Sequence, residues 1–228
     1  EELFENGLKY MLFSHNKKMG SAKGAVLLAE MLYKKEKINY KGLRYFENTD
    51  YENNNVLNSL FYAEEELNGY IITAYSDIIF EPAVVKRLLE SETDISIVVD
   101  IDWRGYYLGR KDHPVDEAEI AIFNANNEVE NIGKIPAEKK DVFGEFIGMM
   151  KFSPRGAVIF KRHFHRAKEM FWDRPFQRAE SFQKAYITDM IQEMVDLGVP
   201  IHCVIIERGW REIDTVEDYE KALKEFEE

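Results

Sequence analysis

Cysteine is almost missing from this sequence of 228 residues, since Cys203 is its only one, and this excludes an intramolecular disulfide framework and a cysteine-rich zinc module. Apolar runs stay short of the ~18–20 residues that a membrane-spanning helix needs. The chain opens with Glu1-Glu2 in place of a basic and then apolar export signal. It also has no Ser/Gly/Pro-rich linker. We therefore expect a single cytoplasmic domain over residues 1–228, without a membrane span.

Positive charge is scarce as well. The chain has 42 Asp and Glu against 30 Lys and Arg, a net charge of −12, which repels a phosphate backbone and argues against a nucleic-acid partner. A bound cation can still create a local site for a small anion. The sequence lacks Gly-x-Ser-x-Gly, Gly-x-x-x-x-Gly-Lys-[Ser/Thr] and His-Glu-x-x-His. The absence of these motifs argues against a serine hydrolase, a P-loop NTPase and a zinc peptidase of the His-Glu-x-x-His type.

What the sequence does contain is an alternation of strand and helix signals. Hydrophobic residues make up 45% of the chain, which is enough for a proper core. The predicted strands are 8–14, 43–47, 70–74, 95–99, 120–123, 130–135, 146–152 and 201–206, and the predicted helices are 23–37, 56–67, 82–89, 154–170, 179–197 and 215–226. Such alternation is typical of an α/β layered sheet, and the strand-dense stretch 118–152 predicts an antiparallel or mixed part. Thr215 and Asp218 form a capping-box pattern at the start of the last helix.

Two aspartates stand where a divalent cation could bind. Asp77 follows a buried strand, and in open parallel sheets the ligand crevice lies beyond the strand ends. Asp214 precedes the last helix. Carboxylates in such places suit Mg²⁺ that also contacts substrate phosphates, although both also suit helix capping.

Three further groups carry polar chemistry. Asn54, Asn55 and Ser59 lie at the start of a predicted helix, where they could cap it or contact an anion or a base edge. The loop 100–119 is long, aromatic and of mixed charge, and is either a substrate flap or a solvated excursion. Lys134 and Glu145 lie at strand edges beside glycines, which permit close backbone approach.

The order of these segments resembles the sugar-nucleotidyltransferase superfamily, which has the nucleotide-diphospho-sugar transferase fold. The likeness covers about residues 40–228 and is greatest to the cytidylyltransferases that act on phosphonates and phosphocholine-type compounds. It rests on Tyr45 to Asn48, Asn54 to Leu60, Ser76 to Phe80, Ile132-Gly133-Lys134, Gly144 to Gly148, Asp189 and Trp210 to Asp218. The fold that it implies is a three-layer, Rossmann-like α/β domain with a mixed sheet.

The resemblance also implies roles for single residues. Asp77 and Asp214 would hold Mg²⁺ and Lys134 would serve catalysis. Asn54, Asn55 and Ser59 would contact the base and ribose of the nucleotide. Glu145 and Asp189 would lie on the acceptor side, and Arg110 would face the acceptor's anionic group.

The implied activity is transfer of CMP from CTP, or of another nucleotide from its triphosphate, to a small phosphonate or phospho-alcohol with release of pyrophosphate. A sugar-1-phosphate nucleotidyltransferase and a non-catalytic nucleotide-binding or interaction module are the alternatives, and the sequence allows an oligomer. One departure is clear: the family's first strand and Gly-rich loop have no counterpart here. Residues 1–7 resemble the end of the helix after that loop, so we expect a chain that lacks the first strand and loop, or a divergent relative.

Overall fold

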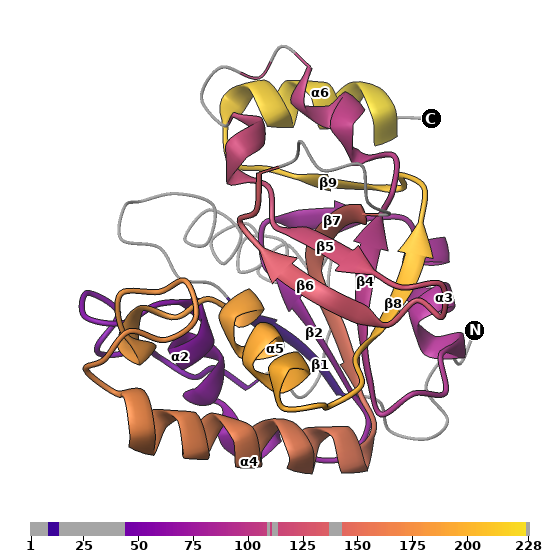
Figure 1. The fold of residues 1–228 in the computed structure, drawn as a ribbon. Coiled ribbons are helices and arrows are strands. Elements are labelled where there is room, and N and C mark those ends of the chain that lie inside the picture. Colours follow the sequence, from indigo (N-terminus) through magenta and orange to yellow (C-terminus); the bar gives the residue numbers. More distant parts are fainter. Residues whose placement is uncertain (1–8, 14–43, 109, 111–113, 137–142, 227–228) are drawn as a thin grey trace.

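The computed structural model describes residues 9–13, 44–108, 110, 114–136 and 143–226. The predictions for 1–7 and for a helix over 23–37 lie outside these residues. Among the described residues, a seven-stranded sheet is the centre of the fold (Figure 1). Its strands are β1 (Lys9–Phe13), β2 (Ile71–Tyr75), β4 (Ile95–Asp100), β5 (Ile120–Phe123), β6 (Val129–Gly133), β7 (Phe143–Phe152) and β8 (His202–Ile206).

The sheet is mixed in direction. Its order is β1-β2-β7-β4-β8, with β5 added beside β7 and β6 beside β5. The β1–β2 and β4–β8 pairs are parallel, whereas β7 is antiparallel to β2, β4 and β5. The prediction of an antiparallel part within 118–152 is therefore confirmed. Because β2, β4 and β8 share one direction, their carboxyl ends meet at one edge, where β7 begins.

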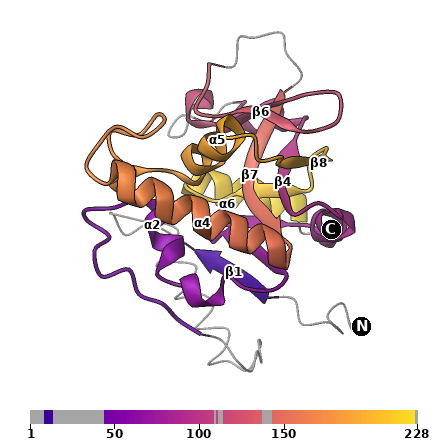
Figure 2. The ribbon, with the colours of Figure 1, turned by 60° about the horizontal axis from the view of Figure 1, so that its bottom comes forward.

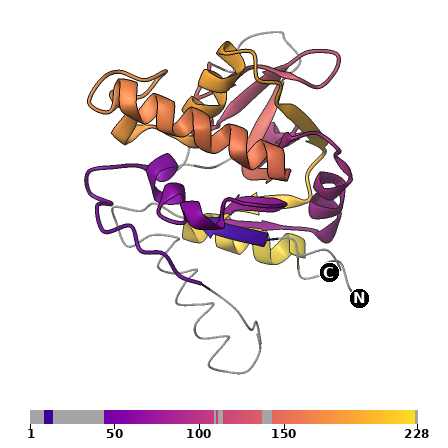
Figure 3. The same ribbon diagram turned by 90° about the horizontal axis from the view of Figure 1, so that it is seen from below.

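Helices cover both faces of the sheet. The helices are α2 (Val56–Phe61), α3 (Pro82–Glu90), α4 (Pro154–Phe171), α5 (Ile187–Asp196) and α6 (Val216–Phe226). Helices α2, α4 and α5 lie on one face, with α4 crossing it (Figure 2), and Figure 3 shows the sheet between α4 and α6. The fold is thus the predicted three-layer α/β arrangement. Within the described residues, no helix has the length and apolar character to span a bilayer.

The strand sequences produce two separate cores because successive side chains point to opposite faces. Ile71 packs in the core under α2, α4 and α5, whereas the next residue, Ile72, packs in the core that contains α3. The same alternation relates Ile97 to Val98. Such two-sided burial explains why these strands read as continuous apolar runs.

Three predicted elements differ from the structure. The helix predicted over 56–67 ends at Phe61, and Glu64–Glu66 form a separate 3₁₀ helix. The described part of the predicted strand 43–47 contains no strand, and the helix predicted over 179–197 begins only at Ile187. The carboxylate of Asp189 accepts hydrogen bonds from the Tyr186 and Arg178 backbone N–H groups, at 2.8 and 3.0 Å. This cap fixes the start of α5. Within 179–186, only Phe182–Lys184 are helical, as a short 3₁₀ helix that packs against α2.

Two short strands were not predicted. Strand β3 (Ile78–Phe80) pairs antiparallel with β9 (Trp210–Glu212) in a ribbon separate from the main sheet. Each has three residues, too few to show a period of two in the sequence. Strand β3 follows β2 and β9 precedes α6, so the ribbon brings these two segments together beside the candidate site.

Candidate active site

A cavity of about 200 Å³ opens at the edge where β2 and β4 end and β7 begins. It lies where open α/β sheets bind their ligands. Four of the nine predicted site residues line it: Asp77, Lys134, Asn55 and Glu145. The other residues of its wall are Val56, Tyr75, Tyr107, Glu117, Glu119, Phe146, Ile147, Tyr186, Trp210 and Glu212.

The β3–β9 ribbon brings Asp77 and Asp214 together although they are far apart in sequence. Ile78 is opposite Glu212 in the ribbon, and the Ile213 N–H donates to the carbonyl of Asp77 at 2.8 Å. The main chain of Asp77 therefore lies beside the residue that precedes Asp214. The ribbon, which the sequence did not reveal, is the element that creates this neighbourhood.

Carboxylates accumulate around this point and repel one another. Burial raises the pKa of Glu212 well above its ordinary value, and the negative charges of Asp214, Glu145 and Asp77 raise it further. A divalent cation would relieve this repulsion, and carboxylate oxygens are the ligands that Mg²⁺ prefers. Among the described residues, no group of three His, Cys, Asp or Glu is arranged as a complete metal site. Asp77 lines the cavity and Asp214 does not. The donor chemistry of the two carboxylates suits a cation that substrate phosphates also hold, and their binding of Mg²⁺ stays a prediction.

Glu145 is the most deeply placed of the carboxylates. Its side chain is buried, and the Tyr107 hydroxyl donates a hydrogen bond to its Oε1 atom. Burial raises the pKa of Glu145 to about 8, with a further contribution from the charge of Asp100. Its Oε2 atom accepts no hydrogen bond from any residue that the structure describes.

Lys134 lies at the rim of the cavity. Its ammonium forms an ion pair with Glu117, and it stands 5.4 Å from the centre of the Tyr186 ring. Its charge also acts on Glu119, a residue of the cavity wall to which the sequence motifs gave no role. Lys134 is the only Lys or Arg among the described residues of the wall.

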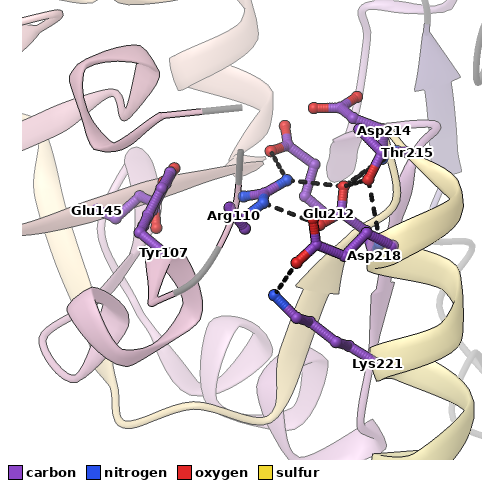
Figure 4. Close-up of polar contacts among 9 residues, drawn as sticks. Tyr107, Arg110, Glu145, Glu212, Asp214, Thr215, Asp218 and Lys221 are labelled. Atoms are coloured by element: carbon purple, nitrogen blue, oxygen red, sulfur yellow. Dashed lines mark hydrogen bonds and ion pairs between the residues drawn. The ribbon is translucent and has the colours of Figure 1, made fainter. Parts of the chain in front are cut away.

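Arg110 lies next to the cavity, in a second, smaller hollow. Its side chain contacts acidic residues of β9 and of the first turn of α6 (Figure 4). Its guanidinium is 2.8 Å from the Asp218 carboxylate and 3.8 Å from that of Glu212. Asp218 also completes the predicted capping box, because its N–H donates to the Thr215 Oγ1 atom and its carboxylate accepts from the Thr215 N–H. Although burial alone would raise it, hydrogen bonds from Arg110 and Thr215 lower the pKa of Asp218. The predicted contact of Arg110 with a substrate anion stays a prediction.

The amides at the start of α2 bind mainly to the chain itself. Asn48 donates to the side chains of Asn54 and Ser59, at 2.7 and 2.8 Å. Asn55 caps α2, since its Oδ1 atom accepts the Val56 N–H at 2.8 Å, and its amide nitrogen donates to the Lys184 carbonyl. Asn55 lines the cavity, whereas Asn54 and Ser59 do not. Asp189 is occupied in capping α5 and is not part of the cavity wall. The predicted nucleotide and acceptor roles of these four residues stay predictions.

The structure adds Tyr75, Tyr107, Glu119 and Glu212 to the site. Glu212 belongs to the Trp210–Asp218 motif, and its position two residues before the predicted metal ligand Asp214 could have indicated it. Tyr107 lies within the loop that was singled out as a flap or a solvated excursion. Glu119 is the last residue of the same loop, and no motif marked it as a single site residue.

Comparison with known proteins supports the resemblance. No protein-family model matches the chain. The chain is 24% identical over 189 residues to the CTP:phosphoglutamine cytidylyltransferase of Campylobacter jejuni, and the match covers 79% of this chain and 72% of that protein.

Solved structures with a similar fold include two enzymes that use CTP. The CTP:phosphocholine cytidylyltransferase of Streptococcus pneumoniae matches with a TM-score of 0.56 and 18% identity, over 86% of this chain and 74% of that one. The inositol-1-phosphate CTP transferase of T. maritima matches with a TM-score of 0.52 and 20% identity, over 75% of this chain. This chain spans only 60% of that protein's length. The predicted superfamily resemblance is confirmed: this chain has the nucleotide-diphospho-sugar transferase fold.

Proposed function

We propose that this chain is a Mg²⁺-dependent cytidylyltransferase that moves CMP from CTP to a small phosphonate or phospho-alcohol. The observation that carries the proposal is the hydrogen bond from the Ile213 N–H to the Asp77 carbonyl, which puts the main chains of Asp77 and Asp214 side by side at one end of the β3–β9 ribbon. Asp77 and Lys134 line the adjoining cavity. Similarity to a cytidylyltransferase over 79% of the chain supports CTP as the donor.

The reaction needs little covalent chemistry from the protein. A phosphate or phosphonate oxygen of the acceptor attacks the α-phosphorus of CTP, and a new P–O bond forms. The bond from the α-phosphorus to the oxygen that bridges it to the β-phosphate breaks, and pyrophosphate leaves. Catalysis of such transfers depends on in-line positioning and on neutralisation of charge.

The residues at the site can supply both contributions. Asp77 and Asp214 would hold Mg²⁺, which supplies charge neutralisation and a template for the triphosphate. Lys134 adds a positive charge at the rim of a cavity whose wall is otherwise acidic. Two anionic substrates can enter this acidic environment only with such compensation, which is why we include the metal in the proposal.

The test is release of pyrophosphate by the full-length protein with CTP, Mg²⁺ and a panel of acceptors. The panel contains 2-aminoethylphosphonate, phosphocholine and glucose 1-phosphate, and UTP and GTP are assayed in place of CTP. We expect turnover with CTP and at least one of the first two acceptors, its loss after chelation of Mg²⁺, and its loss in Asp77→Ala. Asp116→Ala, at an exposed aspartate that does not line the cavity, is the matched control. Turnover only with glucose 1-phosphate, or none with any pair, would overturn the proposal.

A further inference from the structure

Glu119 is a cavity residue that neither the motifs nor the proposed chemistry uses. It directly precedes β5, and its carbonyl accepts the Phe146 N–H from β7 at 2.8 Å. This contact places Glu119 beside the stretch of β7 that carries Glu145. Both side chains line the cavity, and the negative charge of Glu119 contributes to the raised pKa of Glu145.

The carboxylate of Glu119 is held by hydroxyl groups from two other elements. The Tyr75 hydroxyl at the end of β2 donates to its Oε2 atom at 2.9 Å, and the Thr188 hydroxyl of α5 donates to its Oε1 atom at 2.7 Å. Each carboxylate oxygen can accept a second hydrogen bond. Glu119 is therefore an acceptor whose direction is fixed before any ligand arrives.

The Tyr75 ring is itself held in place by a glycine. Gly148 in β7 has a φ of +77°, and a Cβ atom built on it would lie 2.2 Å from the Cδ2 atom of Tyr75. The ring thus lies against the main chain of β7 where no other residue would leave room. Three elements, β2, β7 and α5, are shaped to position one carboxylate, which is more than a solvated acid requires.

The cavity offers a second acceptor close to the first. The buried Oε2 atom of Glu145 accepts no hydrogen bond from any described residue, and an unpaired buried oxygen is costly. Five carboxylates line the wall, those of Asp77, Glu117, Glu119, Glu145 and Glu212. Lys134, the one Lys or Arg in the described part of the wall, is paired with Glu117. The complementary ligand group is cationic and has several N–H donors.

We propose that Glu119, together with Glu145, selects an acceptor that bears a primary ammonium group. This inference rests on the proposed function, which it narrows to amino-alkyl phosphonates and amino-alkyl phosphates. A trimethylated ammonium has the charge but no N–H donor, so it would leave the Glu145 Oε2 atom and the second lone pairs of Glu119 unsatisfied. Sites built to hydrogen-bond a substrate group discriminate strongly against analogues that lack it.

The experiment compares three acceptors that differ only in this group: 2-aminoethylphosphonate, its N,N,N-trimethyl analogue and 2-hydroxyethylphosphonate. With CTP and Mg²⁺, we expect the kcat/KM of the unaltered protein to fall by about 10–100-fold from the primary amine to the trimethyl analogue. Glu119→Gln should raise the KM for the amine by about 10-fold or more and change that for the hydroxyl compound by less than about threefold. Glu130→Gln, an exposed site on β6, should change neither.

A second variant keeps the carboxylate and removes one of its supports. Tyr75→Phe should raise the KM for the amine by a smaller factor than Glu119→Gln, with the KM for CTP unchanged. Equal losses with the amine and the hydroxyl compound in Glu119→Gln would make Glu119 a structural residue and overturn the inference. A preference of the unaltered protein for the trimethyl or the hydroxyl acceptor would also overturn it.

Failure of the proposed function is recognised separately, as absence of turnover with every acceptor. In that case, calorimetric titration with 2-aminoethylphosphonate decides the inference alone. Binding that is lost in Glu119→Gln supports the ammonium site, and absence of binding to the unaltered protein overturns it.

Discussion

Two polar regions near the candidate site are built in opposite ways. At the start of α2, the side chains of Asn48, Asn54, Asn55, Asn58 and Ser59 bond to one another or to backbone carbonyls. Neutral groups that bond within the chain satisfy the needs of burial on their own. This amide cluster therefore fixes how α2 meets the segment 182–185.

The acidic wall of the cavity has no such balance. The charges of Glu145 and Asp77 raise the pKa of Glu212, and the charge of Glu119 raises that of Glu145. Burial of like charges is unfavourable unless a cation or a proton compensates them. The comparison teaches that the amide cluster is satisfied within the chain, whereas the acidic wall needs a bound cation or protonation to offset the repulsion of its charges.

The largest effect that can break this comparison is loss of the paired aspartates. Asp77→Ala and Asp214→Ala should each lower kcat/KM by about 10³-fold or more, because a metal site loses its function when one of two protein ligands is removed. The double variant should lose little more than either single one, since the two act as a unit. Steady-state assays of the four proteins measure this. Fully additive losses would show that the two carboxylates act separately.

The next effect concerns the support of the acidic wall. Gly148→Ala should lower the free energy of unfolding by about 2–4 kcal/mol, because the methyl group collides with the Tyr75 ring and the φ of +77° disfavours a side chain. Gly198→Ala is the matched control, since its φ is also +77° but no atom lies within 4 Å of the added Cβ. Urea unfolding of both variants separates the collision from the backbone strain. Equal losses of unfolding free energy in the two variants would mean that the Tyr75 ring moves away from the added methyl group without an energetic cost.

A smaller effect is the pH dependence of stability. The folded-state pKa of Glu145, about 8, is above its ordinary value, so the folded protein binds more protons than the unfolded chain between these two values. The stability that this proton uptake contributes is fully present below the pKa of Glu145 in the unfolded chain. It is lost as the pH rises through the folded-state pKa of about 8.

Glu145→Gln removes this titration and keeps a group that can accept the Tyr107 hydroxyl. Relative to the unaltered protein, its Tm should therefore rise with pH and be higher at pH 9 by about 2–4 °C for each kcal/mol gained. Thermal unfolding at pH 5.5 and 9 measures the difference. Parallel profiles of the two proteins would contradict the buried, repelled state of Glu145.

The smallest effect tests the amide cluster. Asn55→Ala should cost about 1 kcal/mol of stability through loss of the α2 cap, and it should raise the KM for CTP more than about threefold if the predicted nucleotide contact exists. Asn58→Ala is the comparison, because Asn58 donates to the Phe182 carbonyl behind the cavity and does not line it. It should lose stability without a change in KM. An unchanged KM in both variants would leave Asn55 with a structural role only.

Much of the fold could be predicted because burial leaves a clear record in long elements. Strands such as Ile95–Asp100, buried on both faces, read as apolar runs, and α4 has an apolar face at helical spacing. The three-residue strands β3 and β9 leave no such record. The start of α5 was misplaced because the apolar residues Phe182 and Tyr186 continue its spacing, although the cap formed by Asp189 begins the helix after them.

The candidate site was predicted only where a motif marked it. Asp77, Lys134, Asn55 and Glu145 meet in one cavity, as the strand-end rule and the family resemblance led us to expect. Glu119 could not be found in this way, because its position depends on a tyrosine, a threonine and a glycine from three distant segments. Such convergence is a property of the tertiary structure and leaves no local pattern in the sequence.

The double use of Asp218 couples the end of the chain to the heart of the molecule. The same carboxylate caps the start of α6 and forms an ion pair with Arg110. Arg110 is a neighbour of Tyr107, whose hydroxyl donates a hydrogen bond to Glu145. Tags or truncations at the carboxyl terminus that destabilise the first turn of α6 would therefore also make the position of Glu145 in the cavity less fixed. Substitutions in α6 could therefore alter the cavity without changing a residue that lines it.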